Sequence, residues 1–230
     1  MEHLQFVSPK KGCRIIFISG EIGIGKSSLC QRLVKRFRAG GKKVSGVISP
    51  AVFENGQKIA INAVDLSNDE IIELAAARFS KEKSGQDLTE NKKPTGTIGA
   101  VMQNLGAEIR LSKHKEEGNI ENNHPSNGFG WNIHAQALEW GNQALGKAMP
   151  TEVLFIDELG PLEFQMGAGW MNGLKALDSG QYKLALLVVR PGLLHEARRR
   201  WPEAGLLQIT GPISEADFEG VKANLSSFLK

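Results

Sequence analysis

The sequence RIIFISGEIGIGKS occupies residues 14–27 and decides the fold. Its first six residues, 14–19, are almost continuously apolar, which is typical of a strand buried on both faces of a parallel sheet. The next eight, residues 20–27, fit the pattern G-x-x-x-x-G-K-S/T. Apolar residues at helical spacing then run from residue 26 to residue 39, where Gly40-Gly41 ends the pattern. The stretch therefore predicts a strand, a glycine-rich loop and a helix, which together open a βαβ unit.

The residue types in this loop suit the phosphates of a nucleotide, as in a P-loop or Walker A motif. Glycines allow the backbone N–H groups to turn inward and to approach phosphate oxygens closely, and the positive end of the helix dipole adds to the attraction. We expect Lys26 to reach the β- and γ-phosphates and the Ser27 hydroxyl to ligate magnesium. The predicted nucleotide-binding residues are Gly20, Glu21, Ile22, Gly23, Ile24, Gly25, Lys26, Ser27 and Ser28.

A second apolar run, EVLFID at residues 152–157, ends in the carboxylates of Asp157 and Glu158. The carboxyl ends of parallel strands border the ligand crevice of an open α/β sheet. We therefore expect Asp157 to act as a Walker B aspartate that holds Mg²⁺ together with Ser27. Glu158 is expected to polarise the attacking water as a general base. Two adjacent carboxylates favour hydrolysis over kinase chemistry.

A third apolar run, KLALLVVR at residues 183–190, ends on Arg190, which should face the same crevice. Arg190 could sense the γ-phosphate as an arginine finger. The alternative is an arginine that pairs with an acidic neighbour. The candidate catalytic residues are therefore Lys26, Glu158 and Arg190, and the candidate metal ligands are Ser27 and Asp157.

The remaining elements alternate between strands and helices. Asn55-Gly56, between two β-rich runs, predicts a hairpin. Apolar spacing predicts helices over residues 69–79, 135–148, 169–177, 193–201 and 214–229, and a further strand over residues 206–210. This order predicts a three-layer α/β fold with a mainly parallel central sheet and an antiparallel hairpin excursion. We expect one domain over residues 1–230.

Residues 81–129 are polar and rich in Lys, Glu, Asn and Gly, and we interpret them as an insertion in that domain. Short strands could lie within residues 97–112. Residues 113–127 contain almost no apolar side chains, and we expect them to form a mobile lid that becomes ordered when a nucleotide binds. Trp131 should pack in the core or anchor that lid, with stacking on a nucleobase as the alternative.

The composition excludes several classes of protein. Lys and Arg number 28 and Asp and Glu 25, so the net charge of +3 is too balanced for a dedicated nucleic-acid binder. No apolar run approaches the roughly 20 residues of a membrane span, and residues 1–12 lack a signal-peptide core. Cys13 and Cys30 are too few for a disulfide framework, and we expect reduced thiols. The sequence predicts a cytoplasmic enzyme or switch without a membrane or nucleic-acid partner.

The residues DELGPLE at 157–163 carry a resemblance to a known family. They resemble the motif D-E-I/L-G-x-M/L-E of small P-loop nucleoside-triphosphatases known from thermophiles, whose animal member is called cancer-related nucleoside-triphosphatase. The matching positions are Asp157, Glu158, Gly160 and Glu163, together with Gly20, Gly23, Gly25, Lys26 and Ser27 of the loop. The hairpin segment and Arg190-Pro191 are also similar. The likeness covers residues 12–80 and 130–215 and fails over residues 81–129.

The resemblance implies magnesium-dependent hydrolysis of several nucleoside triphosphates with a weak base preference. We therefore predict a nucleoside-triphosphatase that hydrolyses ATP, GTP and other nucleoside triphosphates to the diphosphate and phosphate. One alternative is a small-molecule kinase that uses the same P-loop and needs an acceptor pocket. The other is a nucleotide-gated switch that acts on a protein partner. A protein partner and a homo-oligomer both stay open at this point.

Overall fold

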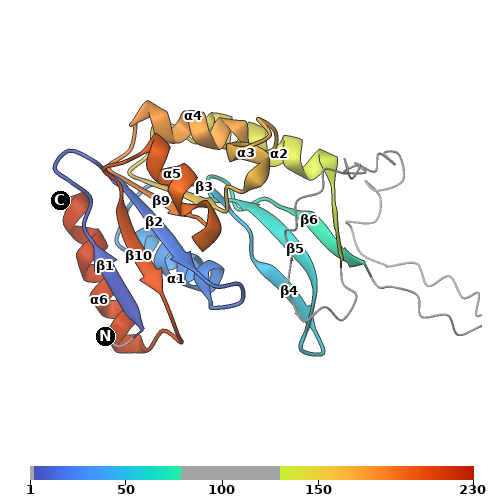
Figure 1. Ribbon diagram of the computed structural model, residues 1–230, viewed down its shortest axis with the longest axis horizontal. Coiled ribbons are helices and arrows are strands. Elements are labelled where there is room, and N and C mark those ends of the chain that lie inside the picture. The colour runs from blue at the N-terminus through green and yellow to red at the C-terminus, as the bar shows by residue number, and fades with distance from the viewer. Residues whose placement is uncertain (1–2, 79–129) are drawn as a thin grey trace, which may run out of the picture.

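The computed structural model describes residues 3–78 and 130–230, which form one sheet with helices on both faces (Figure 1). The expected insertion, its strands and its lid lie outside the described residues. The strands are β1 (Leu4–Val7), β2 (Ile15–Gly20), β3 (Val44–Ile48), β4 (Ala51–Glu54), β5 (Gln57–Asp65), β6 (Ile71–Arg78), β7 (Gly130–Ile133), β8 (Val153–Asp157), β9 (Leu184–Val188) and β10 (Gly205–Ile209). The helices are α1 (Lys26–Ala39), α2 (Ala135–Lys147), α3 (Pro161–Phe164), α4 (Met171–Ser179), α5 (Leu194–Arg200) and α6 (Glu215–Ser226), with short 3-10 turns η1 (Pro191–Leu193) and η2 (Ser227–Leu229).

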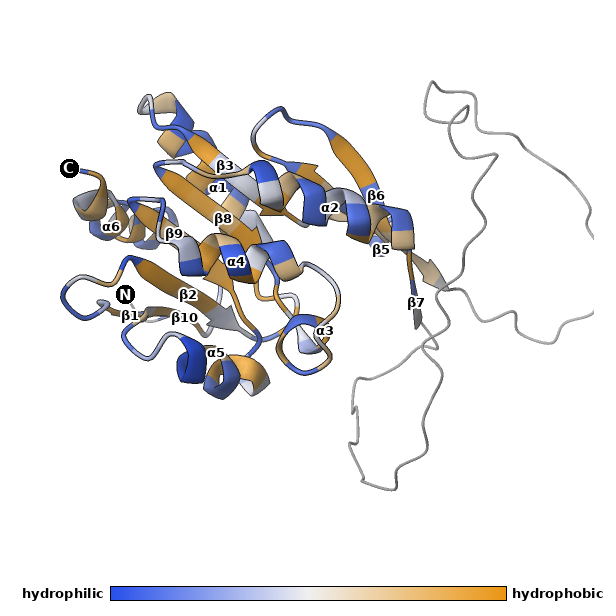
Figure 2. Ribbon diagram, turned by 90° about the horizontal axis from the view of Figure 1, so that it is seen from above, coloured by the Kyte–Doolittle hydropathy of each residue, from blue (hydrophilic) through white to orange (hydrophobic). Residues whose placement is uncertain are grey.

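The centre of the sheet is parallel. Strands pair in the order β1-β10-β2-β9-β8-β3-β5-β6-β7, and β4 pairs with β5. The five strands from β10 to β3 run parallel to one another. Every residue of β2, β8 and β9 is buried, as their continuous apolar runs predict. Figure 2 shows these central strands as predominantly hydrophobic.

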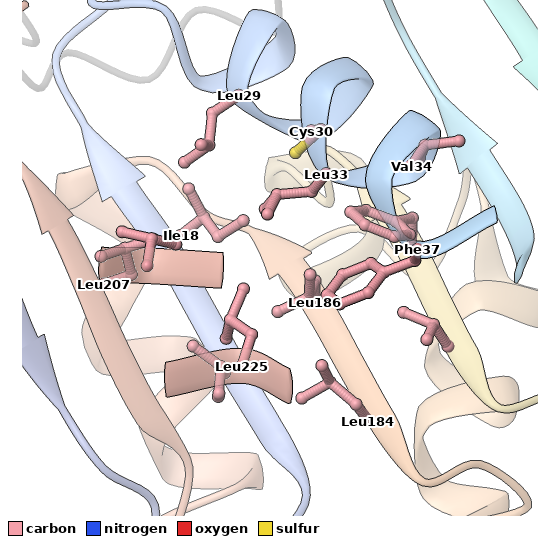
Figure 3. Packing of buried hydrophobic residues seen from close by; sticks show 14 of the residues in the cluster. Ile18, Leu29, Cys30, Leu33, Val34, Phe37, Leu184, Leu186, Leu207 and Leu225 are labelled. Carbon is pink, nitrogen blue, oxygen red and sulfur yellow. The ribbon is translucent and has the colours of Figure 1, made fainter. Parts of the chain in front are cut away.

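Two hydrophobic clusters hold the layers together. On one face, α1 and α6 pack against the sheet, and Leu33 and Phe37 of α1 share one cluster with Leu225 of α6 (Figure 3). On the other face, α2, α4 and α5 cover the strands around the buried residues Leu145 and Leu174. The expected three-layer α/β fold is thus confirmed.

The antiparallel part of the sheet is larger than the expected hairpin. The β4–β5 hairpin is present, and Asn55 and Gly56 have φ values of 50° and 77°. Positive φ at both positions is the mark of a type I′ turn. Strands β6 and β7 extend this region by antiparallel pairing with β5 and with each other. At the opposite edge, β1 pairs antiparallel with β10.

The helix predicted over residues 69–79 is wrong, because this segment contains strand β6. Its backbone pairs with β5 on one side and with β7 on the other. Ile72 and Leu74, two positions apart, pack against the core, while Ile71 is 62% exposed. Over so short a run, the apolar spacing fits both the helical and the strand period. Sheet pairing here outweighs the high helix propensity of the alanines.

Two further findings bear on the sequence predictions. Among residues 3–78 and 130–230, the structure contains no helix with the length and apolar character of a membrane span. Cys13 and Cys30 are both free thiols, and Cys30 is buried in the core.

Candidate functional site

The phosphate loop joins β2 to α1 with the conformation that its glycines permit. Gly23 and Gly25 have φ values of 80° and 99°, a region that residues with side chains rarely adopt. Gly20 is needed for a different reason, since a Cβ there would lie 2.6 Å from the carbonyl oxygen of Ile209 on the neighbouring strand. Ile22 is exposed at the loop. The loop therefore has the backbone shape of an anion cradle at the start of a helix.

Lys26 is the first residue of α1, and its side chain turns back over the loop. Its Nζ donates hydrogen bonds to the carbonyl oxygens of Gly20, at 2.7 Å, and Glu21, at 2.8 Å. Burial lowers the pKa of Lys26, while the charges of Glu158 and Asp157 oppose this shift. The ammonium group thus lies near both carboxylates that the sequence places at the end of β8.

Asp157 is the last residue of β8 and is buried. The backbone N–H of Ser49 donates to Oδ2 of Asp157 over 3.1 Å, and the Ser49 hydroxyl donates to the Asp157 carbonyl over 2.6 Å. Burial raises the pKa of Asp157 from 3.8 to about 6, against hydrogen bonding from Ser49 and Ser27. Ser27 and Asp157 are therefore neighbours, as a shared metal site requires.

Ser49 is a site residue that the sequence analysis did not identify. It follows β3, and β3 pairs in parallel with β8. A polar residue at the end of β3 would have indicated a site residue only if the pairing of β3 with β8 had been known.

The raised pKa of Asp157 predicts a stability cost that depends on pH. In the unfolded chain the carboxyl group ionises near 3.8, whereas in the folded protein it ionises near 6. The folded state therefore loses stability as the pH rises through this window, by roughly 3 kcal/mol at most. Asp157→Asn cannot ionise, so we expect its Tm at pH 8 to exceed that of the wild type by up to about 6–12 °C. The gain should vanish at pH 4 in the same thermal melts.

A control of opposite sign is available for this experiment. The Ser214 hydroxyl lowers the pKa of Asp217 in the capping box of α6. Asp217→Asn should therefore lower the Tm at pH 8. An Asp157→Asn variant that melts at or below the wild-type temperature at pH 8 would refute a burial cost at this carboxylate.

Glu158 and Arg190 form an ion pair, in which Arg190 Nε donates to Glu158 Oε1. They meet because β8 and β9 are adjacent parallel strands, with Asp157 opposite Val188. The pairing of Arg190 with an acidic neighbour is thus observed, while its role as an arginine finger stays a prediction. The carboxylate of Glu158 is partly exposed, so water can reach it.

Glu163, the last residue of the DELGPLE motif, braces the loop that follows Glu158. Its two carboxylate oxygens accept hydrogen bonds from the backbone N–H groups of Gly160 and Trp170, each at 2.7 Å. Glu163 is itself buried. A Cβ on Gly169 would lie 2.1 Å from Glu163 Oε1, which accounts for a glycine at that position. Glu163 is thus a structural member of the motif.

Comparison with known proteins agrees with these features. A family model described as NTPase matches residues 15–104. This match runs beyond residue 80, where we expected the likeness to fail, and it stops before residues 130–215. The nucleoside-triphosphatase THEP1 of Saccharolobus solfataricus is 34% identical over 55 residues, which is 24% of this chain and 31% of that protein. THEP1 of Sulfurisphaera tokodaii is 30% identical over 66 residues, or 29% and 38% of the two chains.

A solved structure extends the comparison to the whole fold. The solution structure of a human cancer-related nucleoside triphosphatase covers 95% of this chain and 98% of its own, with a TM-score of 0.54 and 16% identity. This likeness concerns the fold alone, and the chain aligns with about a third of the length of its curated relatives. The fold, the matched residues and the motifs together confirm the resemblance of this chain to the small P-loop nucleoside-triphosphatases.

Proposed function

We propose that the protein is a magnesium-dependent nucleoside-triphosphatase that hydrolyses ATP, GTP and other nucleoside triphosphates to the diphosphate and phosphate. The observation that carries the proposal is the convergence of five side chains at the carboxyl ends of β2, β8 and β9. They are Lys26, Ser27, Asp157, Glu158 and Arg190. The THEP1 relatives are named as nucleoside-triphosphatases, which supports the same activity here.

The donors at Ser27 and Asp157 fit Mg²⁺. Both offer oxygen atoms, and Asp157 is oriented by Ser49. Among residues 3–78 and 130–230, no group of three or more His, Cys, Asp or Glu side chains could hold a metal ion. Mg²⁺ suits a site with few protein ligands because it keeps several waters and binds phosphate oxygens. When bound, Mg²⁺ supplies charge neutralisation at the β- and γ-phosphates.

The other residues would bind the nucleoside triphosphate and accept a proton from the attacking water. Loop N–H groups and the N-terminus of α1 bind the phosphates. Lys26 exchanges its two loop carbonyls for phosphate oxygens and stabilises the charge that develops on the transferred group. Glu158 takes a proton from the attacking water. Arg190 orients Glu158 through Nε, which leaves its terminal N–H groups to bind the γ-phosphate.

Glu158→Gln tests the role of the general base. The amide keeps the shape of the side chain but cannot accept a proton, so we expect hydrolysis to slow by about 10²-fold or more. Binding of a non-hydrolysable triphosphate with Mg²⁺ should persist. Glu139→Gln, on the exposed face of α2, is the control and should leave phosphate release unchanged. If the variant instead lost binding of the triphosphate while the rate of the hydrolysis step itself was preserved, Glu158 would be a metal ligand or a structural residue.

The same turnover assay separates the alternative functions. A small molecule that accelerates nucleotide consumption and becomes phosphorylated would indicate a kinase. A protein retained only with the non-hydrolysable analogue would indicate a switch. Location in the cytoplasm, homo-oligomerisation and the absence of a nucleic-acid partner stay predictions from the sequence.

A further inference from the structure

The β4–β5 hairpin extends beyond the edge of the sheet that carries the proposed site. Strand β5 pairs with β3 near Val64 and with β4 from Gln57 to Ile61, so β4 continues the direction of β3 after Ser49 and Pro50. Because Ser49 binds Asp157, the hairpin begins next to the proposed metal ligand. Figure 1 shows its tip on the same side of the sheet as the loop between β2 and α1.

Lys58, near the tip of this hairpin, places a second lysine close to the crevice. Its Nζ lies 4.9 Å from the centre of the Trp131 ring on β7. The charges that act on Lys58 are those of Glu158, Arg190 and Asp157. Partial burial lowers the pKa of Lys58, which the two carboxylates oppose. Lys58 therefore belongs to the same electrostatic neighbourhood as the residues proposed for catalysis, although it comes from a different part of the chain.

The ammonium group of Lys58 is available to an anion. Among the residues that the structure describes, it has no carboxylate within ion-pair distance, and its contact is the face of Trp131. An aromatic face attracts a cation without consuming its N–H donors. The residue stays exposed to solvent, so a ligand can reach it. A cation held in this way is preorganised for a phosphate oxygen.

We propose that Lys58 binds the γ-phosphate end of the nucleoside triphosphate and that Trp131 positions it there. This inference rests on the proposed function, because the phosphate loop must first place the nucleotide in the crevice. The γ-phosphate is favoured over the nucleobase because the ammonium group is positively charged and phosphate oxygens are negatively charged. In addition, Glu158, the proposed general base for attack on that phosphate, is the charged group that acts most strongly on Lys58. Lys58 would thus distinguish a triphosphate from a diphosphate.

The experiment measures binding of a non-hydrolysable triphosphate and of the corresponding diphosphate to the full chain with Mg²⁺. Lys58→Met keeps the length of the side chain and removes its charge. We expect it to weaken triphosphate binding by about tenfold, the scale of a hydrogen bond to a charged group, and diphosphate binding by less than about twofold. Lys58→Arg should retain most of the discrimination. Gln57→Met is the control, because the adjacent strand residue faces the opposite side.

Trp131 variants test the positioning role. Trp131→Leu should reduce the preference for triphosphate in the same direction as Lys58→Met, and Trp131→Phe should largely preserve it. Unchanged triphosphate affinity in Lys58→Met, or equal losses for both nucleotides, would overturn the inference. Failure of the wild-type chain to bind or hydrolyse any nucleoside triphosphate, with Lys26→Ala indistinguishable from it, would instead refute the proposed function.

Discussion

Lys26→Ala should reduce phosphate release by at least about 10²–10³-fold, the scale for loss of one group that stabilises transition-state charge. The Nζ group contacts only carbonyl oxygens of its own loop among the described residues, so its loss should leave the sheet and α1 folded. Steady-state phosphate release measures the effect, and circular dichroism with a thermal melt checks the fold.

Lys26→Met is the matched variant because it fills the same space without the charge. Both variants should be inactive and should melt close to the wild type. Near-normal release by either purified variant would refute the assignment of the loop as the phosphate site.

Gly46→Ala should prevent stable folding, with a loss of about 4 kcal/mol or more in the free energy of unfolding. Gly46 lies in β3 with φ 110°, and a Cβ there would lie 1.9 Å from the carbonyl oxygen of Phe155 on β8. Backbone atoms cannot yield as the end of a flexible side chain can, so the parallel pair β3–β8 would have to separate. Denaturant unfolding of whatever soluble protein is obtained measures the loss.

Gly41→Ala separates conformational strain from steric overlap. Gly41 also has a positive φ, 72°, but a Cβ there would meet no atom within 4 Å. Its cost should be only about 1–2 kcal/mol, that of a left-handed residue with a side chain. Equal stabilities of the two variants would show that the contact with Phe155 is not the limiting factor.

The predictable part of the fold is the part where local sequence leaves one interpretation. The apolar runs that end at Ser19 and Asp157 are too short for helices and too continuous for surface strands. Lys26–Ala39 was predicted with its exact bounds because the loop fixes its start and Gly40 its end. Strand β6 was mispredicted because its apolar spacing also fits a helix, and because β7, which pairs with one of its edges, is distant in sequence.

The candidate site likewise contains residues that local sequence patterns identify and residues that only the strand order brings together. Lys26, Asp157 and Glu158 were identified because each lies inside a motif or at a strand end. Ser49 and Lys58 were not, since their roles depend on which strands are neighbours. The ion pair between Glu158 and Arg190 likewise follows from the adjacency of β8 and β9, which no local pattern specifies.

The pairing of β6 with β7 has a consequence for how this chain can vary in length. Arg78, where β6 ends, lies opposite Gly130, where β7 begins. The chain thus leaves the sheet and re-enters it at one register position. Closing a longer connection between two points already held together adds little entropy cost, about 0.6 kcal/mol for each doubling of length. Insertions and deletions between these two residues can therefore accumulate during evolution without moving the strands that carry the crevice.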